Sequence, residues 1–186
     1  MTTYLVESYV TKLDEPGRQA LVAAARAAAD SLRREGFPVS YLGSIFAPGD
    51  EMCLHLFEAT SADLIRRASR RWALSCERIV EVVESRDPPT NRKEPHMAQY
   101  VVDRHLTGFP PEQLPAAARA AKQTSAELSR EGVEVRYVRS TWVPDGERCY
   151  CLFEGPSREA VEEVQRRASL PYEQIREAVF LSAEDV

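Results

Sequence analysis

The chain of 186 residues has no long apolar run, few lysines and only three histidines. No apolar stretch approaches the roughly 20 residues that a membrane-spanning helix needs, so we expect no contact with a membrane. No signal peptide precedes Tyr4, and we therefore expect a cytoplasmic protein. The net charge of −5, with arginines interleaved among acids, argues against a nucleic-acid partner.

Several catalytic and cofactor motifs are also missing. There is no glycine-rich phosphate loop, no GxGxxG, no nucleophile elbow, no paired CxxC motif and no HExxH. This excludes the usual nucleotide and flavin sites. In a cytoplasmic protein the four cysteines are expected to be reduced thiols.

What the chain does contain is an internal repeat. With 44% hydrophobic and 28% charged residues its composition is that of a soluble globular protein. When the sequence is shifted by 96 residues it matches itself without a gap. Matched pairs include Tyr4 with Tyr100, Gly36 with Gly132, Tyr41 with Tyr137, Pro48 with Pro144 and Cys53 with Cys149. A constant offset indicates one folding unit written twice.

The hydrophobic pattern of the first copy alternates between strand and helix periods. We expect strands over residues 4–10, 39–46, 52–58 and 79–84, and helices from Asp14 to Gly36 and from residue 60 to about Trp72. Pro48-Gly49-Asp50 predicts a hairpin turn between the second and third strands. The second copy repeats this order over residues 100–181. We therefore expect repeats at 1–85 and 99–186, joined by a proline-broken linker at 86–98.

The order β-α-β-β-α-β predicts an α+β fold made of two tandem ferredoxin-like units. A four-stranded sheet with both helices on one face leaves its other face open, and that apolar face must be covered. We expect the two units to pack through their open sheet faces as an internal pseudo-dimer, an α+β barrel in one chain. The space between the sheets is then the expected pocket, and further oligomerisation is left open.

Strand parity assigns side chains to the two faces of each sheet. In the third strands we assign the leucines to the helix-covered face and the alternate residues to the open face. In the first strands we assign Tyr4 and Val6 to the helices. The expected inter-sheet set is then Glu7, Tyr9, Cys53, His55, Asp103, His105, Cys149 and Cys151.

Two carboxylates at matching positions, Glu7 and Asp103, are the most suggestive members of this set. In a poorly solvated space they repel, which raises the pKa of at least one unless a cation lies between them. The alternative is a structural ion pair with an arginine of the second or fourth strand, with Arg136, Arg139 and Arg176 as candidates. The thiols alone are ordinary core residues.

Four phrases occur in a distinctive order: Tyr4-Leu-Val-Glu7, Tyr100-Val-Val-Asp103, Cys149-Tyr-Cys-Leu-Phe-Glu154 and Ser169-Leu-Pro-Tyr-Glu-Gln-Ile175. They resemble a family of short bacterial single-domain proteins of largely unknown function, one actinobacterial member of which is described as nickel-binding. The resemblance covers nearly all of both copies, and the second copy is the more similar. It implies a ferredoxin-like unit that pairs through its open sheet face. It also implies an acid in the first strand and a cysteine in the third, the latter matched by Cys151 and replaced by His55 in the first copy. The second-helix positions where many members carry histidine hold Ala68, Trp72, Val164 and Ala168 here.

Three functional hypotheses follow. The first is a nickel-like divalent metal site, with nickel or zinc held by Glu7, His55, Asp103 and Cys151. The second is a small-molecule binder or a cofactor-free enzyme of the cyclase, isomerase or oxygenase type that uses the inter-sheet cavity. In it His55 acts as general acid or base, Glu7 or Asp103 orients it, and the ligand contacts are Tyr41, Tyr137, Tyr9 and His105. The third is a scaffold whose open faces bind another protein. Whether the protein is an enzyme stays open.

Overall fold

The computed structural model describes residues 1–11, 13–72, 76–86 and 97–185, which form an α+β fold with eight antiparallel strands and four α-helices. The first half contains β1 (Thr2–Tyr9), α1 (Glu15–Arg34), β2 (Val39–Ala47), β3 (Met52–Ala59), α2 (Ala62–Trp72) and β4 (Arg78–Arg86). The second half contains β5 (Ala98–His105), α3 (Leu114–Arg130), β6 (Arg136–Val143), β7 (Arg148–Gly155), α4 (Arg158–Arg167) and β8 (Gln174–Ser182). The predicted order β-α-β-β-α-β therefore occurs in both halves, and most of the predicted linker lies outside the described residues.

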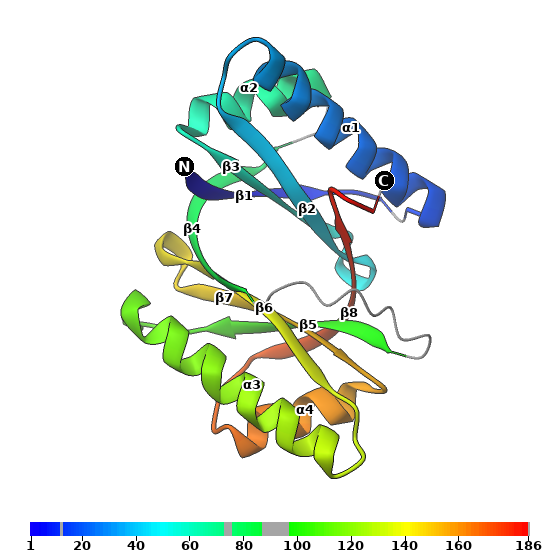
Figure 1. Ribbon diagram of the computed structural model, residues 1–186, viewed down its shortest axis with the longest axis vertical. Helices are drawn as coiled ribbons and strands as arrows, with labels where there is room; N and C mark the ends of the chain where they lie inside the picture. The colour runs from blue at the N-terminus through cyan, green and yellow to red at the C-terminus, as the bar shows by residue number, and fades with distance from the viewer. Residues whose placement is uncertain (12, 73–75, 87–96, 186) are drawn as a thin grey trace. The chain divides into compact units, whose positions relative to one another are not determined.

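The chain divides into two compact units (Figure 1). Unit 1 comprises residues 1–82 and 179–186, and unit 2 comprises residues 83–178. In unit 1, β3 lies between β1 and β2 and pairs with both in antiparallel fashion. In unit 2, β7 lies between β5 and β6 in the same way. Each unit is thus built around its third strand.

The fourth strand of each half begins in one unit and ends in the other. Residues 78–82 of β4 pair with β1 in unit 1, whereas residues 83–86 pair with β6 in unit 2. Likewise residues 174–178 of β8 pair with β5, and residues 179–182 pair with β2. Each sheet therefore receives an edge segment from the other half of the sequence.

Local sequence signals explain where α1 starts and stops. The side chain of Asp14 caps the helix by accepting a hydrogen bond of 2.9 Å from the amide of Gly17, and Pro16 occupies the first turn. Gly36 follows the helix with φ of +89°, a left-handed conformation that glycine adopts without steric cost. The predicted hairpin is also present as a short 3₁₀ turn, Pro48–Asp50, followed by Glu51 at φ of +53°.

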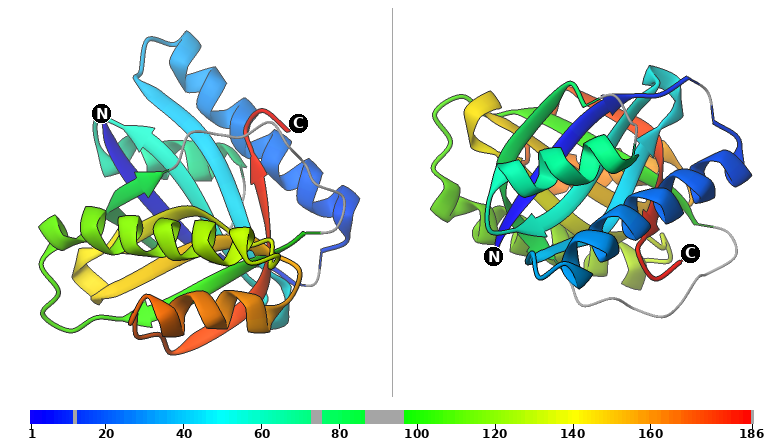
Figure 2. Two further views of the ribbon diagram at one scale, coloured as in Figure 1. Left: turned by 60° about the horizontal axis from the view of Figure 1, so that its bottom comes forward. Right: turned by 90° about the horizontal axis from the view of Figure 1, so that it is seen from above.

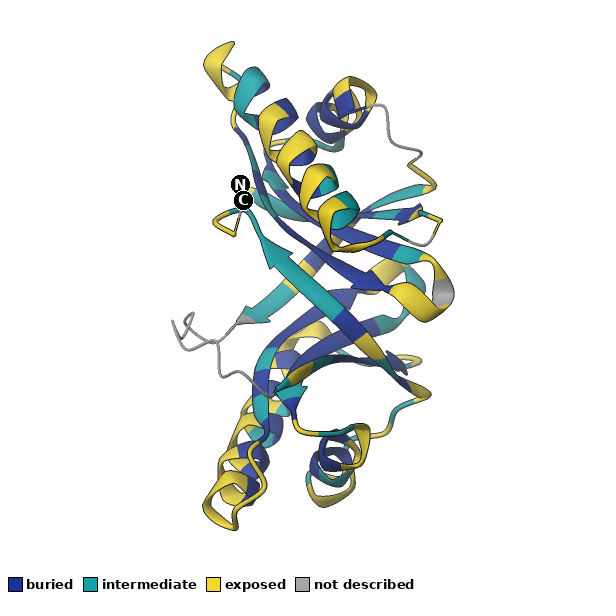
Figure 3. Cartoon of the chain, turned by 90° about the vertical axis from the view of Figure 1, so that its right-hand side faces the viewer, coloured by how far each residue is buried: buried dark blue, intermediate teal, exposed yellow. Residues whose placement is uncertain are grey.

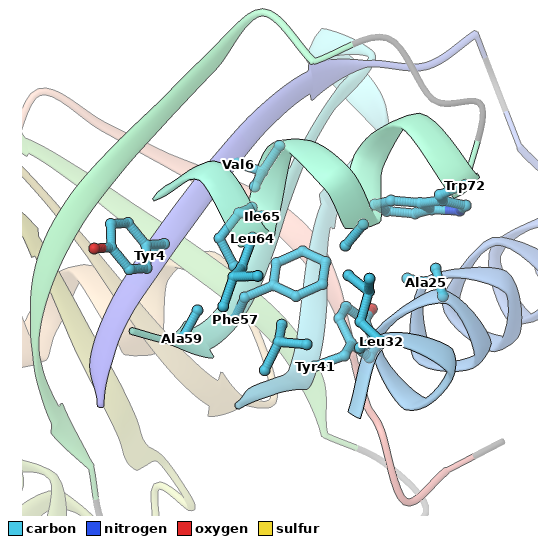
Figure 4. Close-up of a cluster of buried hydrophobic side chains, with 14 of the residues drawn as sticks. Tyr4, Val6, Ala25, Leu32, Tyr41, Phe57, Ala59, Leu64, Ile65 and Trp72 are labelled. Atoms are coloured by element: carbon cyan, nitrogen blue, oxygen red, sulfur yellow. The ribbon is translucent and has the colours of Figure 1, made fainter. Parts of the chain in front are cut away.

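The two helices of each unit cover one face of its sheet (Figures 1 and 2). In unit 1, Ala25 and Leu32 of α1 and Ile65 of α2 belong to one buried apolar cluster with Tyr4 and Phe57 of the sheet (Figure 4). Unit 2 repeats this cluster with Leu128, Val161, Tyr100 and Phe153 among its members. The outer sides of the helices are exposed and their inner sides buried (Figure 3). This helix-covered layer is where the polar side chains described next are enclosed.

Candidate functional site

The third strands present their leucines to the face opposite from the one predicted. Directly paired residues of antiparallel strands share a face, and His55 pairs with Val6, which belongs to the helix-covered cluster. Cys53, Cys149 and Cys151 belong to the helix-covered clusters as well. The assignment of Cys53, His55, Cys149 and Cys151 to the open face is therefore wrong. Parity could not decide it, because Leu54 and Leu56 are also fully buried and both faces of β3 are apolar.

The acids of the first strands lie on the face away from the helices, as predicted. Glu7 pairs with Leu54, and Asp103 pairs with Tyr150. Asp103 is almost fully buried and makes ion pairs with Arg148 at 2.9 Å and Arg176 at 3.2 Å. The structural ion-pair interpretation, with Arg176 as one predicted partner, therefore describes Asp103.

The predicted metal set is consequently divided between the two faces of each sheet. In unit 1 the sheet separates Glu7 from His55, and in unit 2 it separates Asp103 from Cys151. Across residues 1–11, 13–72, 76–86 and 97–185, no group of three or more His, Cys, Asp or Glu side chains is arranged to hold a metal ion. The four residues do not form one site.

The four residues predicted to contact a ligand also lie in different places. Tyr9 and His105 are exposed at the ends of β1 and β5, and His105 lies 3.8 Å from the carboxylates of Glu147 and Glu173. Tyr41 and Tyr137 are instead buried beneath the helices, where each hydroxyl contacts a serine. Only the two buried tyrosines remain next to groups that could carry chemistry.

In unit 1 the buried polar group is the histidine cluster, which we define as Ser8, Ser44, Cys53 and His55. The imidazole Nε2 lies 2.9 Å from the Ser8 hydroxyl, and Nδ1 lies 2.5 Å from the Ser44 hydroxyl. The indole of Trp72 packs against the imidazole with ring centroids 4.2 Å apart. His55 is fully buried, and burial lowers its pKa to about 3, so it is neutral at physiological pH.

In unit 2 the matching positions, each 96 residues later, form the thiol cluster, which we define as Arg104, Ser140, Cys149 and Cys151. The Cys151 sulfur accepts hydrogen bonds from Arg104 Nε at 3.4 Å and from the Ser140 hydroxyl at 3.0 Å. The sulfur of Cys149 lies 3.6 Å from that of Cys151. Two donors, one of them charged, therefore point at the Cys151 sulfur and a second thiol lies beside it, an environment that favours a thiolate.

Arg104 is a charged group in an apolar layer. It is 4% exposed, and its remaining N–H groups donate to the carbonyl of Pro171 and to the side-chain oxygen of Gln165. Among the described residues no carboxylate forms an ion pair with it. A buried guanidinium is costly without a counter-charge, and a Cys151 thiolate supplies one. The hydrogen bond from Cys149 lowers the pKa of Cys151, and the charge of Arg104 lowers it further. The hydrogen bond between the two thiols raises the pKa of Cys149.

The thiol cluster opens into a small apolar cavity between the sheet and α3, with a volume of about 120 Å³. Its lining consists of Arg104, Leu106, Phe109, Leu114, Ala117, Ala121, Ser140, Cys149, Cys151, Leu170 and Pro171. Two residues of unit 1 have smaller counterparts in unit 2: Leu21 corresponds to Ala117, which lines the cavity, and Trp72, which packs against His55, corresponds to Ala168. The two thiols thus line a cavity, whereas an indole packs against His55.

Sequence reasoning missed Arg104, Ser140 and Gln165. A signal for Arg104 was available, because it is a charged residue in a strand where its counterpart in the first copy is Ser8. Gln165 had no such signal, because a glutamine in a helix is expected on the solvent-exposed side. It is in fact 1% exposed.

Comparison with known proteins relates the second unit to one family. Residues 100–178 match the family model described as nickel responsive protein SCO4226-like, which confirms the resemblance for that part of the chain. Among curated proteins none matches. No helix within the described residues is both long and apolar enough to cross a membrane.

Solved structures of similar arrangement span nearly the whole chain at low identity. A candidate monooxygenase from Lactobacillus acidophilus is 11% identical, with 98% of this chain and 95% of that chain covered and a TM-score of 0.48. A chlorite dismutase from Candidatus Nitrospira defluvii in complex with imidazole is 10% identical, with 98% and 92% covered and a TM-score of 0.49. Likeness at this level carries no inference about activity.

Proposed function

We propose, starting from the match of residues 100–178 to the nickel-responsive family and from the thiol cluster, that unit 2 is the functional half of this chain. In this proposal it binds a small, mainly apolar organic molecule beside Cys151, whose thiolate is the reactive group. The observation that carries the proposal is that Cys149 and Cys151 line a cavity while Trp72 packs against the corresponding His55. This is the small-molecule hypothesis, moved from the space between the sheets to the helix-covered layer.

The size and lining of the cavity limit the ligand. An apolar cavity of 150 Å³ takes up benzene, so a volume of about 120 Å³ has room for roughly six non-hydrogen atoms. Leucine, phenylalanine and alanine side chains make up most of its wall, which favours an alkyl or aryl group. The polar end of the ligand would meet Arg104, Ser140 and the thiols. Such a pocket selects a small molecule with one polar, reactive terminus.

A metal ion is the second candidate because of the description of the matched family. The residues present do not fit a resident nickel ion: they offer two thiols, with no third His, Cys, Asp or Glu side chain arranged with them among the described residues. Arg104 also donates to the sulfur that a cation would need. We therefore derive no chemistry through a metal.

The packing of the two units as an internal pseudo-dimer stays a prediction. The proposed site does not depend on it, because the thiol cluster and its cavity are made entirely by residues of unit 2.

The proposal is tested by thermal denaturation of the full chain with small apolar molecules, benzene and tert-butanol, and separately with Ni²⁺. We expect at least one organic molecule to raise the Tm of the wild-type protein in proportion to ln(1 + [L]/Kd). Two variants that import the unit 1 residues, Ala117→Leu and Ala168→Trp, fill the cavity and should lose this shift. Cys53→Ser, which alters the matching thiol of unit 1, should keep it.

Two results would contradict this assignment. Equal shifts in the wild-type protein and both cavity-filling variants would place the ligand elsewhere. A shift with Ni²⁺ that disappears in Cys151→Ser, with no response to organic molecules, would favour the metal candidate.

A further inference from the structure

We infer that the thiol cluster reduces small organic hydroperoxides, with Cys151 as the attacking sulfur and Cys149 as the thiol that resolves the product. This inference rests on the proposed function, because it uses the same cavity, and it names the chemical class of the ligand. The proposal combines four features of unit 2: a sulfur held by charged and neutral donors, a second sulfur beside it, an apolar cavity, and no competing carboxylate among the residues that line the cavity.

The hydrogen-bond donors around Cys151 can stabilise both the attacking sulfur and the oxygen that leaves the peroxide. Arg104 Nε and the Ser140 hydroxyl contact the sulfur at 3.4 and 3.0 Å and hold it as an acceptor. When a hydroperoxide O–O bond breaks, negative charge develops on the departing oxygen within reach of the same guanidinium. A fixed positive charge in a water-poor site stabilises that charge strongly. The apolar wall would hold the alkyl group of the peroxide.

Cys149 lies close enough to Cys151 to act as the resolving thiol, the one that attacks the oxidised sulfur. Its sulfur is 3.6 Å from that of Cys151, and residues two apart on a strand point to the same face. The strand rise places their Cα atoms about 6.8 Å apart, at the upper end of the span that disulfides bridge. A bond formed there is expected to be easily reduced again by an external thiol, which suits a catalytic pair.

The chemistry balances as two steps. In the first, the Cys151 thiolate attacks the terminal oxygen of R–O–OH, the O–O bond breaks, and Cys151 becomes a sulfenic acid while RO⁻ leaves. The alkoxide takes the proton of Cys149 and departs as the alcohol. In the second, the Cys149 thiolate attacks the Cys151 sulfur, forms the disulfide and expels hydroxide, which solvent protonates. The peroxide is reduced by two electrons and the two thiols are oxidised by two.

Unit 1 provides an internal comparison. Its matching thiol, Cys53, lies 3.5 Å from the imidazole of His55, and burial raises its pKa. In unit 1 the position that corresponds to Cys151 is occupied by His55, so Cys53 has no second thiol at the matching position. Cys53 should therefore stay reduced under conditions that oxidise Cys151, and Cys76, an exposed thiol whose pKa is raised by partial burial, is the reference within the same chain.

The test uses the full chain, fully reduced and under argon, with one equivalent of tert-butyl hydroperoxide, a molecule of the size that the cavity admits. We expect the protein to lose two hydrogens, with the new bond mapped to Cys149 and Cys151, and one equivalent of tert-butanol to form. Cys151 should react at least roughly tenfold faster than Cys76 in the same sample. Cys149→Ser should stop at a single added oxygen on Cys151 that dimedone traps, whereas Cys53→Ser should behave as wild type.

Oxidation of Cys151 no faster than that of Cys76 would overturn this inference, as would a Cys149→Ser variant that still forms an internal disulfide at Cys151. If the organic molecules still shift the Tm in that case, the cavity binds a ligand and only the peroxide chemistry fails. If they do not, the proposed function fails with it.

Discussion

At the scale of single residues, the two copies differ in which polar group they bury at the same place. Position 55 of the first copy is an imidazole and position 151 of the second is a thiol. The imidazole is surrounded by Ser8, Ser44, Cys53 and Trp72, none of which is charged. Desolvation therefore acts on His55 unopposed and keeps it neutral.

A pH-dependent stability follows from His55. Its pKa is about 3 in the folded chain against an ordinary value of 6.5, so between these values unfolding takes up a proton. The free energy of unfolding should fall as pH drops below about 6.5, by up to about 1.4 kcal/mol per pH unit from this residue. Urea denaturation at pH 7.5, 6.5 and 5.5 measures it.

His55→Gln keeps a side chain of similar hydrogen-bonding capacity without the titration, and it should show a shallower dependence over that range. Equal slopes for the wild-type protein and the variant would mean that His55 takes up a proton as readily in the folded chain as in the unfolded chain.

At the scale of elements, β2 carries an irregularity at Gly43 where a side chain would be strained, whereas the matching irregularity of β6 carries Arg139. The register of β2 against β3 shifts between Tyr41 and Gly43, and that of β6 against β7 shifts between Tyr137 and Arg139. Gly43 has φ of +152°, and a Cβ there would lie 2.7 Å from the carbonyl oxygen of Leu181 in β8. The bulge thus combines backbone strain with close approach of the neighbouring strand.

Gly43→Ala should therefore destabilise the chain by roughly 1–3 kcal/mol, through strain and displacement of the end of β8. Gly49→Ala is the matched control, because a Cβ at that position meets nothing within 4 Å and Gly49 does not have a positive φ. Guanidinium denaturation of both variants gives the comparison. A Gly43→Ala variant as stable as Gly49→Ala would show that β8 yields to the added methyl group.

The elements themselves were largely predictable, and the reason is local. Asp14, Pro16 and Gly36 mark the ends of α1 through capping and backbone conformation, which depend on neighbouring residues only. Which residues of β3 face the helices was not predictable, because Leu54 and His55 are both fully buried. Alternation of apolar and polar residues identifies the core face of a strand only when its other face is solvated. The thiol cluster depends on that choice: Cys151 was predicted to lie on the face away from the helices, and the structure places it in the helix-covered cluster.

At the scale of the whole molecule, the repeat is regular in its elements and asymmetric in its chemistry. β1 and β5, β3 and β7, and β4 and β8 begin and end 96 residues apart, so the two copies keep one backbone plan. Within that plan, the first copy buries a neutral imidazole under Trp72, and the second buries Arg104 and two thiols beside a cavity. In our proposal the first copy keeps a structural core while the second carries the site.

The central claim, that the reactive centre lies in unit 2 and not in unit 1, is tested most directly by site-resolved alkylation. The native protein is treated with iodoacetamide between pH 5.5 and 8.5, and the rates at Cys151 and Cys53 are measured by peptide mass spectrometry. Because the hydrogen bond from Cys149 and the charge of Arg104 lower the pKa of Cys151 while burial raises the pKa of Cys53, we predict that Cys151 is modified at neutral pH and Cys53 is not. Alkylation of Cys53 at a rate equal to or above that of Cys151 would contradict the account.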